Sequence, residues 1–123
     1  MICYDLRFPV WSRNQYLQSE KRMDYDLLLY VANWPAVRVS AWDMLLQARA
    51  IENLSYVIGV NRVGQDGKGI EYNGHSVVVD PKGNQERLMI DDVTVYSQSL
   101  SGEGLLAYRE KFPAYLDADD FNV

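Results

Sequence analysis

Two short apolar runs separated by a helix-forming segment constrain the fold of this 123-residue chain most strongly. Residues 26–32 (DLLLYVA) and 55–61 (SYVIGVN) each have the length of a strand and are apolar almost throughout, which is typical of strands covered on both faces. Residues 37–53, between them, contain good helix formers and neither Gly nor Pro. This order predicts an α/β fold in which helices pack on a sheet.

The segments that flank this unit predict shorter elements. Pro9 is suited to a first helical turn, so we expect a helix from about Phe8 to Tyr16. A glycine-rich loop is expected over residues 64–74, short strands over 76–79, 85–89 and 93–99, a turn at 81–84, and a helix over 101–111 that ends before Pro113. We therefore expect one domain at residues 1–112 and an acidic, aromatic tail at residues 113–123.

Charge, cysteine content and hydropathy exclude several classes of function. The net charge is -5, from 12 Lys and Arg against 17 Asp and Glu, and no basic cluster interrupts it, so nucleic acid is not an expected partner. A single cysteine cannot form an internal disulfide, which favours a reducing compartment and hence the cytoplasm. No apolar run approaches the roughly 18 to 20 residues of a membrane span, and no membrane association is expected.

The helix expected at residues 37–53 carries charge on its apolar face. At about 100° per residue, one face collects the residues Trp42, Leu45, Leu46, Arg49 and Asn53. Glu52 lies beside Arg49, and Arg38 joins them from the start of the segment. Buried charges cost several kcal/mol unless they are paired, so Arg49 and Glu52 are expected to form a structural ion-pair network or a subunit contact. Direct work at an active site is the alternative.

Cys3 stands directly before the first predicted helix. A lone cysteine is usually a small buried apolar residue, but the backbone N–H groups at a helix start favour a thiolate and can donate to a developing oxyanion. This position is typical of a nucleophile in acyl transfer. Two alternatives involve the single histidine: a Cys3–His75 catalytic dyad, and a redox or metal site formed by the same two residues. We expect no metal and no cofactor.

Further short motifs are spread over nearly the whole chain. They are residues 2–9 (ICYDLRFP), 30–35 (YVANWP), 48–53 (ARAIEN), 74–76 (GHS) and 80–83 (DPKG). The first closely resembles the nucleophile segment of the nitrilase superfamily of carbon–nitrogen hydrolases. The others follow it in the order and spacing seen in the omega-amidase-like branch of that superfamily.

The resemblance implies a mechanism in which the Cys3 thiolate attacks an amide carbon, ammonia leaves, and water hydrolyses the thioester. Tyr4 would contribute its backbone N–H to the oxyanion site, while Asn33 and Trp34 would line the substrate pocket. Arg7 would either hold the turn after the cysteine or contact a substrate carboxylate. The implied substrate is a small omega-amide of a 2-oxo acid, such as 2-oxoglutaramate.

The resemblance also implies groups that lie outside this sequence. The family's glutamate base, its lysine and a supporting glutamate all precede the nucleophile, and neither Glu52 nor Lys68 replaces them by position. The implied fold is a four-layer α-β-β-α sandwich, of which this chain would form the C-terminal half. We then expect little amidase activity from the chain alone, and an apolar face covered in a homo-oligomer or by a missing N-terminal half. A non-catalytic fragment that serves as an assembly or binding module is the alternative.

Overall fold

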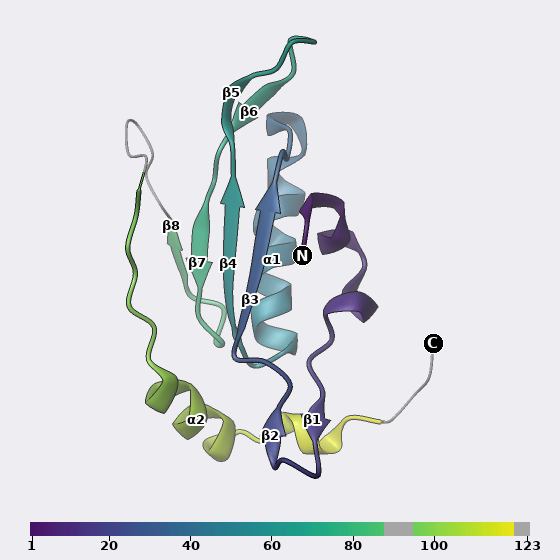
Figure 1. The fold of residues 1–123 in the computed structure, drawn as a ribbon, viewed down its shortest axis with the longest axis vertical. Helices are drawn as coiled ribbons and strands as arrows, with labels where there is room; N and C mark the ends of the chain where they lie inside the picture. The colour runs from purple at the N-terminus through teal and green to yellow at the C-terminus, as the bar shows by residue number, and fades with distance from the viewer. Residues whose placement is uncertain (88–94, 120–123) are drawn as a thin grey trace.

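The computed structural model describes residues 1–87 and 95–119, and its centre is a four-stranded sheet (Figure 1). The strands are β3 (Leu27–Ala32), β4 (Tyr56–Asn61), β7 (Val77–Val79) and β8 (Gln85–Arg87), in the order β3-β4-β7-β8. β3 and β4 are parallel, and β7 and β8 add antiparallel strands beside β4. The predicted α/β architecture is confirmed.

One helix connects the two parallel strands and covers one face of the sheet. The 3-10 turn η3 (Ala36–Arg38) leads into α1 (Val39–Glu52), close to the helix predicted over residues 37–53. The buried core combines Leu28, Tyr30, Ala32 and Val57 of the strands with Trp42, Leu46 and Ala50 of α1. Gly59 lets the helix approach, because a Cβ at this position would lie 2.4 Å from Leu46 Cδ1.

The opposite face of β3 and β4 is apolar but exposed, and we call Leu27, Leu29, Val31 and Val60 the open face. Their side chains are between 42% and 53% exposed. In Figure 1 this face is turned to the viewer, with α1 behind the sheet. The apolar pattern of both faces of β3 predicted two covering layers, and the chain itself provides one of them.

The start of the chain extends the sheet edge beside β3. The Met1 ammonium donates to the Leu29 carbonyl at 3.0 Å, and Ile2 forms a parallel bridge with Val31. Cys3 therefore leaves the sheet at the carboxyl end of its parallel strands. Two 3-10 turns follow, η1 (Cys3–Arg7) and η2 (Pro9–Ser12), so the α-helix predicted from Phe8 to Tyr16 was wrong. Pro9 has no N–H to continue the turns of η1, which divides the segment.

Two further expectations are corrected. The predicted loop at 64–74 contains a hairpin of β5 (Val63–Gln65) and β6 (Glu71–Asn73), because Asp66 closes its turn by accepting the backbone N–H groups of Lys68 and Ile70. Residues 95–99 form no strand, since no neighbouring strand pairs with them in the described part of the chain. Residues 88–89 and 93–94 of the predicted strands lie outside the described residues.

The C-terminal helix α2 (Gly102–Lys111) confirms the predicted helix and is followed by the 3-10 turn η4 (Ala114–Asp117). The Ser101 hydroxyl caps α2 by accepting the Gly104 N–H at 3.0 Å. A small antiparallel pair, β1 (Tyr16–Leu17) and β2 (Arg22–Met23), was not predicted. Neither helix of the described residues has the length and apolar character that crossing a membrane requires.

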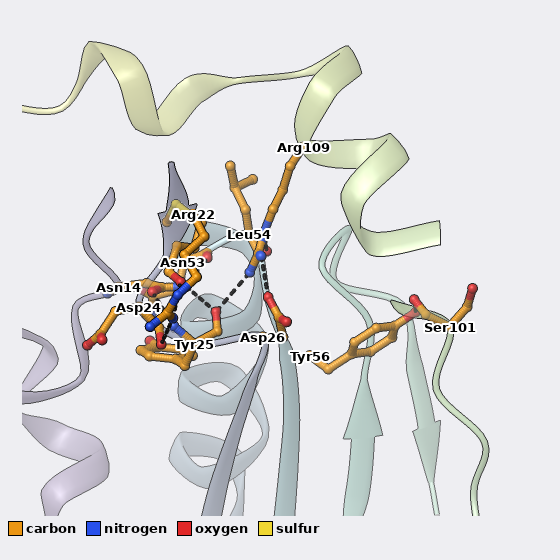
Figure 2. A network of polar contacts seen from close by, with 11 residues as sticks. Asn14, Arg22, Asp24, Tyr25, Asp26, Asn53, Leu54, Tyr56, Ser101 and Arg109 are labelled. Carbon is orange, nitrogen blue, oxygen red and sulfur yellow. Dashed lines mark hydrogen bonds and ion pairs between the residues drawn. The ribbon is translucent and has the colours of Figure 1, made fainter. Parts of the chain in front are cut away.

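A buried polar network fastens α2 to the amino end of the parallel strands (Figure 2). Arg109 donates to the carbonyls of Leu54, at 2.8 Å, and Tyr25, at 3.0 Å, and it pairs with Asp26. The Asn14 N–H donates to the Asn53 side chain at 2.8 Å in the same region. We call this set the amino-end network.

Candidate active site

Cys3 has a strained backbone that directs it out of the sheet. Its φ is +41°, in the left-handed region that costs a residue with a Cβ of the order of 1 kcal/mol or more. A reciprocal pair of hydrogen bonds holds this turn: the Ile2 N–H donates to Asp5 Oδ2 at 2.9 Å, and the Asp5 N–H donates to the Ile2 carbonyl at 3.0 Å. The sequence analysis did not identify Asp5, although a carboxylate three residues after the last extended residue is a known capping signal.

The thiol lies at the edge of the sheet beside the turn that follows β3. Cys3 Sγ is 3.8 Å from the carbonyl oxygen of Asn33, which is its one hydrogen-bond contact within residues 1–87 and 95–119. The side chains of Asn33 and Tyr4 are exposed at the same edge. The structure therefore places Cys3, the backbone of Tyr4 and Asn33 at one edge of the sheet.

Arg49 anchors the segment after Cys3 from beneath. It is 3% exposed, its Nη2 donates to the Leu6 carbonyl at 2.7 Å, and its Nη1 pairs with Glu52 Oε1 at 2.7 Å. The Arg49–Glu52 ion pair expected from the sequence is thus present, and it connects α1 to η1. Arg38 does not join this pair, because η3 leaves its side chain exposed at the other end of the helix.

Arg7 and Trp34 contact each other. The Arg7 guanidinium lies 5.0 Å from the centroid of the Trp34 ring, a cation–π arrangement. Trp34 is 3% exposed, packs on Trp42, and donates its indole N–H to the Arg38 carbonyl at 2.7 Å. Trp34 is therefore a buried residue next to Asn33, and the Arg7 guanidinium packs on its ring.

Asn61 is a residue that the sequence analysis missed. Its Oδ1 accepts the Trp34 N–H at 2.7 Å, and its Nδ2 donates to the carbonyls of Trp34, at 3.0 Å, and Gly74, at 2.8 Å. These contacts fix the turn that carries Asn33. An amide that ends an otherwise apolar strand was the available signal, because a buried amide needs hydrogen-bond partners.

The β5–β6 hairpin adds a second group of polar side chains to this edge. The Arg62 guanidinium lies 4.7 Å from the centroid of the Tyr72 ring, and the Tyr72 hydroxyl donates to Asp66 Oδ2 at 3.1 Å. Partial burial and this bond to Asp66 raise the pKa of Tyr72, and the charge of the nearby Cys3 contributes to the same direction. The backbone N–H groups of Ile70 and Lys68 hold the pKa of Asp66 below its usual value.

His75 is engaged on the helix side of the sheet. Its Nδ1 lies 3.1 Å from Asp43 Oδ2, and its carbonyl accepts the Trp42 indole N–H at 2.9 Å. The Cys3–His75 dyad therefore gains no support from these contacts. In the part of the chain that the structure describes, no three His, Cys, Asp or Glu side chains gather as ligands for a metal ion.

A depression of about 890 Å³ lies at the other end of the sheet and is lined by residues such as Tyr16, Glu52, Leu54 and Tyr115. Neither Cys3 nor Asn33 borders it. Cys3 thus lies outside this depression, at the carboxyl end of the parallel strands.

Comparisons with known proteins found a matching family model, similar sequences and a similar solved structure. The sequence model of the carbon–nitrogen hydrolase family matches residues 1–85. The omega-amidase YafV of Yersinia enterocolitica is 54% identical over 121 residues, which are 98% of this chain and 44% of the relative. The 2-oxoglutaramate amidase of Bacillus subtilis is 40% identical over 83 residues, 68% of this chain and 30% of the relative.

One solved structure matches the fold along the whole length of this chain. XC1258 of Xanthomonas campestris, a CN-hydrolase superfamily protein with an arsenic adduct in its active site, superimposes with a TM-score of 0.90 and 45% identity. The match covers 100% of this chain and 47% of that structure. The chain thus spans less than half the length of each of these three proteins.

Proposed function

The chain belongs to the carbon–nitrogen hydrolase family, and from this premise we propose that it supplies the nucleophile of an amidohydrolase that releases ammonia from a small omega-amide. The observation that carries the proposal is Cys3 itself. It is the single cysteine of the chain, held at a φ of +41° where the parallel strands end. Strained residues at such positions cluster at catalytic sites.

In the proposed reaction the Cys3 thiolate attacks the amide carbon, a C–S bond forms, and the carbonyl electrons move onto oxygen. The backbone N–H of Tyr4 donates to this oxyanion. Collapse of the intermediate breaks the C–N bond, the nitrogen takes up a proton and leaves as ammonia, and water then hydrolyses the thioester. We assign the proton transfers to acid–base groups outside this chain.

The remaining residues of the site have supporting roles in this proposal. Asn33, exposed beside the thiol, lines the substrate pocket, and the buried Trp34 supports it from below. Arg7 holds the first turn after Cys3 by packing on Trp34. The Arg49–Glu52 pair positions that turn through the Leu6 carbonyl.

The names of the relatives support a substrate class for this proposal. One is an omega-amidase and another a 2-oxoglutaramate amidase, so we propose 2-oxoglutaramate as the substrate to test first. The arsenic adduct in the active site of the Xanthomonas protein also supports a thiol site, because soft thiolates favour such thiophilic elements.

The assembly follows from the open face. Four apolar side chains there are between 42% and 53% exposed, and a sheet face of this kind is normally covered. We propose that it is covered either by a missing N-terminal half or by a second copy in a homo-oligomer. Light scattering on the purified chain distinguishes a monomer from an oligomer.

A chimera tests the proposed activity. The 121-residue matching region of the Yersinia omega-amidase is replaced by this chain, which the 54% identity makes structurally conservative. We expect the chimera to release ammonia from 2-oxoglutaramate, and Cys3→Ala to lower the rate by a factor of the order of 10³ or more. Retained turnover in Cys3→Ala would refute the nucleophile assignment.

The second candidate function is an assembly module without turnover. It is favoured by the surroundings of the thiol, whose hydrogen-bond contact in the described residues is a carbonyl rather than a base. A folded chimera that binds 2-oxoglutaramate but releases no ammonia is the outcome that this candidate predicts.

A further inference from the structure

Arg62 and Cys3 lie at the same edge of the sheet. Cys3 follows the N-terminal segment that pairs with β3, and Arg62 follows β4. Ile2 pairs with Val31 of β3, and Ala32 of β3 pairs with Asn61 of β4. Cys3 follows the first of these pairs, and Arg62 follows the second. The Arg62 N–H donates to the Ala32 carbonyl at 3.3 Å, which fixes its backbone beside the turn that contains Asn33.

The alternation of β4 places Arg62 on the side of the open face. Val57, Gly59 and Asn61 are buried beneath α1, whereas Val60 and Arg62 are exposed. Successive residues of a strand point to opposite faces, so the Arg62 side chain leaves the sheet on the side away from the helix. Asn33 follows Val31 in the same alternation on β3 and is likewise exposed.

Contacts within the hairpin orient the Arg62 guanidinium but do not neutralise its positive charge. It packs on the Tyr72 ring and donates from Nη2 to the Gln65 carbonyl at 3.4 Å. No carboxylate forms an ion pair with Arg62 in residues 1–87 and 95–119. The nearby Asp66 is occupied, since its oxygens accept the N–H groups of Lys68 and Ile70 and the Tyr72 hydroxyl.

Arg62 and Cys3 lie at the same edge of the sheet, with β3 between them. Neighbouring strands are about 4.8 Å apart, so the backbones of Cys3 and Arg62 are separated by roughly 10 Å. The Arg62 side chain covers part of this distance, and a substrate with a carboxylate at one end and an amide at the other covers the rest.

We propose that Arg62 binds the carboxylate of the substrate while Cys3 attacks the amide at its other end. The inference rests on the proposed amidase function and names the group that selects an omega-amide over an uncharged amide. A stacked guanidinium presents its N–H groups in a fixed plane, which suits bidentate binding of a carboxylate. The sequence analysis had assigned a carboxylate contact to Arg7 as one of two roles, and Arg62 takes that role here.

Alkylation of the isolated chain tests the site without turnover. The probes are 5-chloro-4-oxopentanoate and its neutral amide, which place a carboxylate or a carboxamide four bonds from the reacting carbon. The Cys3 thiolate displaces chloride and forms a C–S bond with either probe. Because the chain has one cysteine, mass spectrometry reports one rate constant for each probe.

We measure the ratio of the acid rate to the amide rate in four proteins. Arg62→Gln is expected to lower the ratio about three- to tenfold relative to the unchanged chain, and Arg62→Lys to lower it by less. Lys68→Gln is the matched control, because it removes one positive charge from the turn of the same hairpin, and it should leave the ratio unchanged. Circular dichroism verifies that all four proteins are folded, which the exposure of Arg62 leads us to expect.

Two results overturn the proposal. One is an acid-to-amide rate ratio that is the same in the unchanged chain and in Arg62→Gln. The other is a ratio that falls as much in Lys68→Gln as in Arg62→Gln, which shows diffuse electrostatic attraction rather than a site. Alkylation needs no general acid or base. A chimera that releases no ammonia, together with a ratio that depends on Arg62, therefore contradicts the amidase and supports the carboxylate site.

Discussion

The two ends of the β3–β4 pair are built in opposite ways. At the amino end, Leu54 also has a left-handed backbone, with a φ of +47°, but it is buried and its carbonyl accepts a hydrogen bond from Arg109. At the carboxyl end, Cys3 is strained at a φ of +41° and partly exposed, with its sulfur 3.8 Å from a carbonyl. The amino end satisfies the Leu54 carbonyl internally, whereas the carboxyl end leaves the Cys3 thiol partly exposed.

This difference indicates how stability and function are divided along the same two strands. The amino-end network joins α2, β3 and the end of α1 through buried hydrogen bonds. Such contacts hold the strands in register and let the opposite end keep exposed and strained groups.

Arg109→Met should cause the largest loss of stability. The substitution leaves the Leu54 carbonyl without its donor and removes the partner of Asp26. It also removes one of the two donors to the Tyr25 carbonyl, which keeps Asn14 Nδ2. We expect the free energy of unfolding in urea to fall by about 3 kcal/mol. Lys111→Met, on the exposed surface of the same helix, should change it by less than about 0.5 kcal/mol.

The same variant tests whether the two ends are independent. While the protein remains folded, Arg109→Met should leave the alkylation rate of Cys3 unchanged. A change of several-fold in that rate would show that the amino-end network reaches the thiol, and the comparison of the two ends would then fail.

Arg49→Met should have the next largest effect, because Arg49 connects α1 to the turn after Cys3. The Leu6 carbonyl loses its donor, and we expect a loss of about 2 kcal/mol in the free energy of unfolding. Unlike Arg109→Met, this variant should also alter the alkylation rate of Cys3. Glu52→Gln is the control: its side chain is 45% exposed, and the amide oxygen of Gln can still accept a hydrogen bond from Arg49, so we expect a smaller loss, of about 1 kcal/mol.

Glycine at position 3 should stabilise the protein relative to alanine. Both variants lack the thiol, but only glycine adopts a φ of +41° without a steric cost from Cβ. We expect Cys3→Gly to be more stable than Cys3→Ala by about 1 kcal/mol in urea unfolding. Equal stability of the two would mean that the turn is not strained, and the argument from Cys3 would lose its main support.

The smallest effect concerns the pH dependence of the hairpin. The backbone N–H groups of Ile70 and Lys68 lower the pKa of Asp66 in the folded state below its ordinary value of 3.8. The stabilisation is therefore present above that value and is lost as the pH falls through the lower, folded pKa. Hydrogen exchange of the Ile70 amide should accelerate over this range, beyond the intrinsic pH effect, and Asp66→Asn should abolish the difference.

The sequence was informative where the pattern is local and long. β3, α1, β4 and α2 follow from apolar runs and helix-forming segments. The nucleophile role of Cys3 was predicted from its place before a turn and from the family resemblance, and it stays a prediction. The buried position of Arg49 was predictable because charge on an apolar helix face needs a partner.

The remaining features depend on contacts between residues that are far apart in the chain. Asn61 is recognisable as a clamp only when Trp34 and Gly74 are seen beside it. The β5–β6 hairpin was missed because its glycines suggested a loop, while the Asp66 turn that makes it stable is a tertiary detail. Arg62 had no motif of its own, and its position beside Cys3 arises from the pairing register of two strands.

The open face also sets a kinetic condition on how this chain is produced. β3 is the uncharged run Leu27–Ala32, and in the described residues Met1 and Ile2 pair its outer edge at Leu29 and Val31 but not at Leu27. An apolar strand with a free edge and a bare face is a template for other strands. Capture by a covering layer then competes with encounters between identical chains, whose rate rises with the square of concentration. Yield should therefore depend on when the covering polypeptide is supplied, and a partner present during synthesis should rescue more protein than one added afterwards.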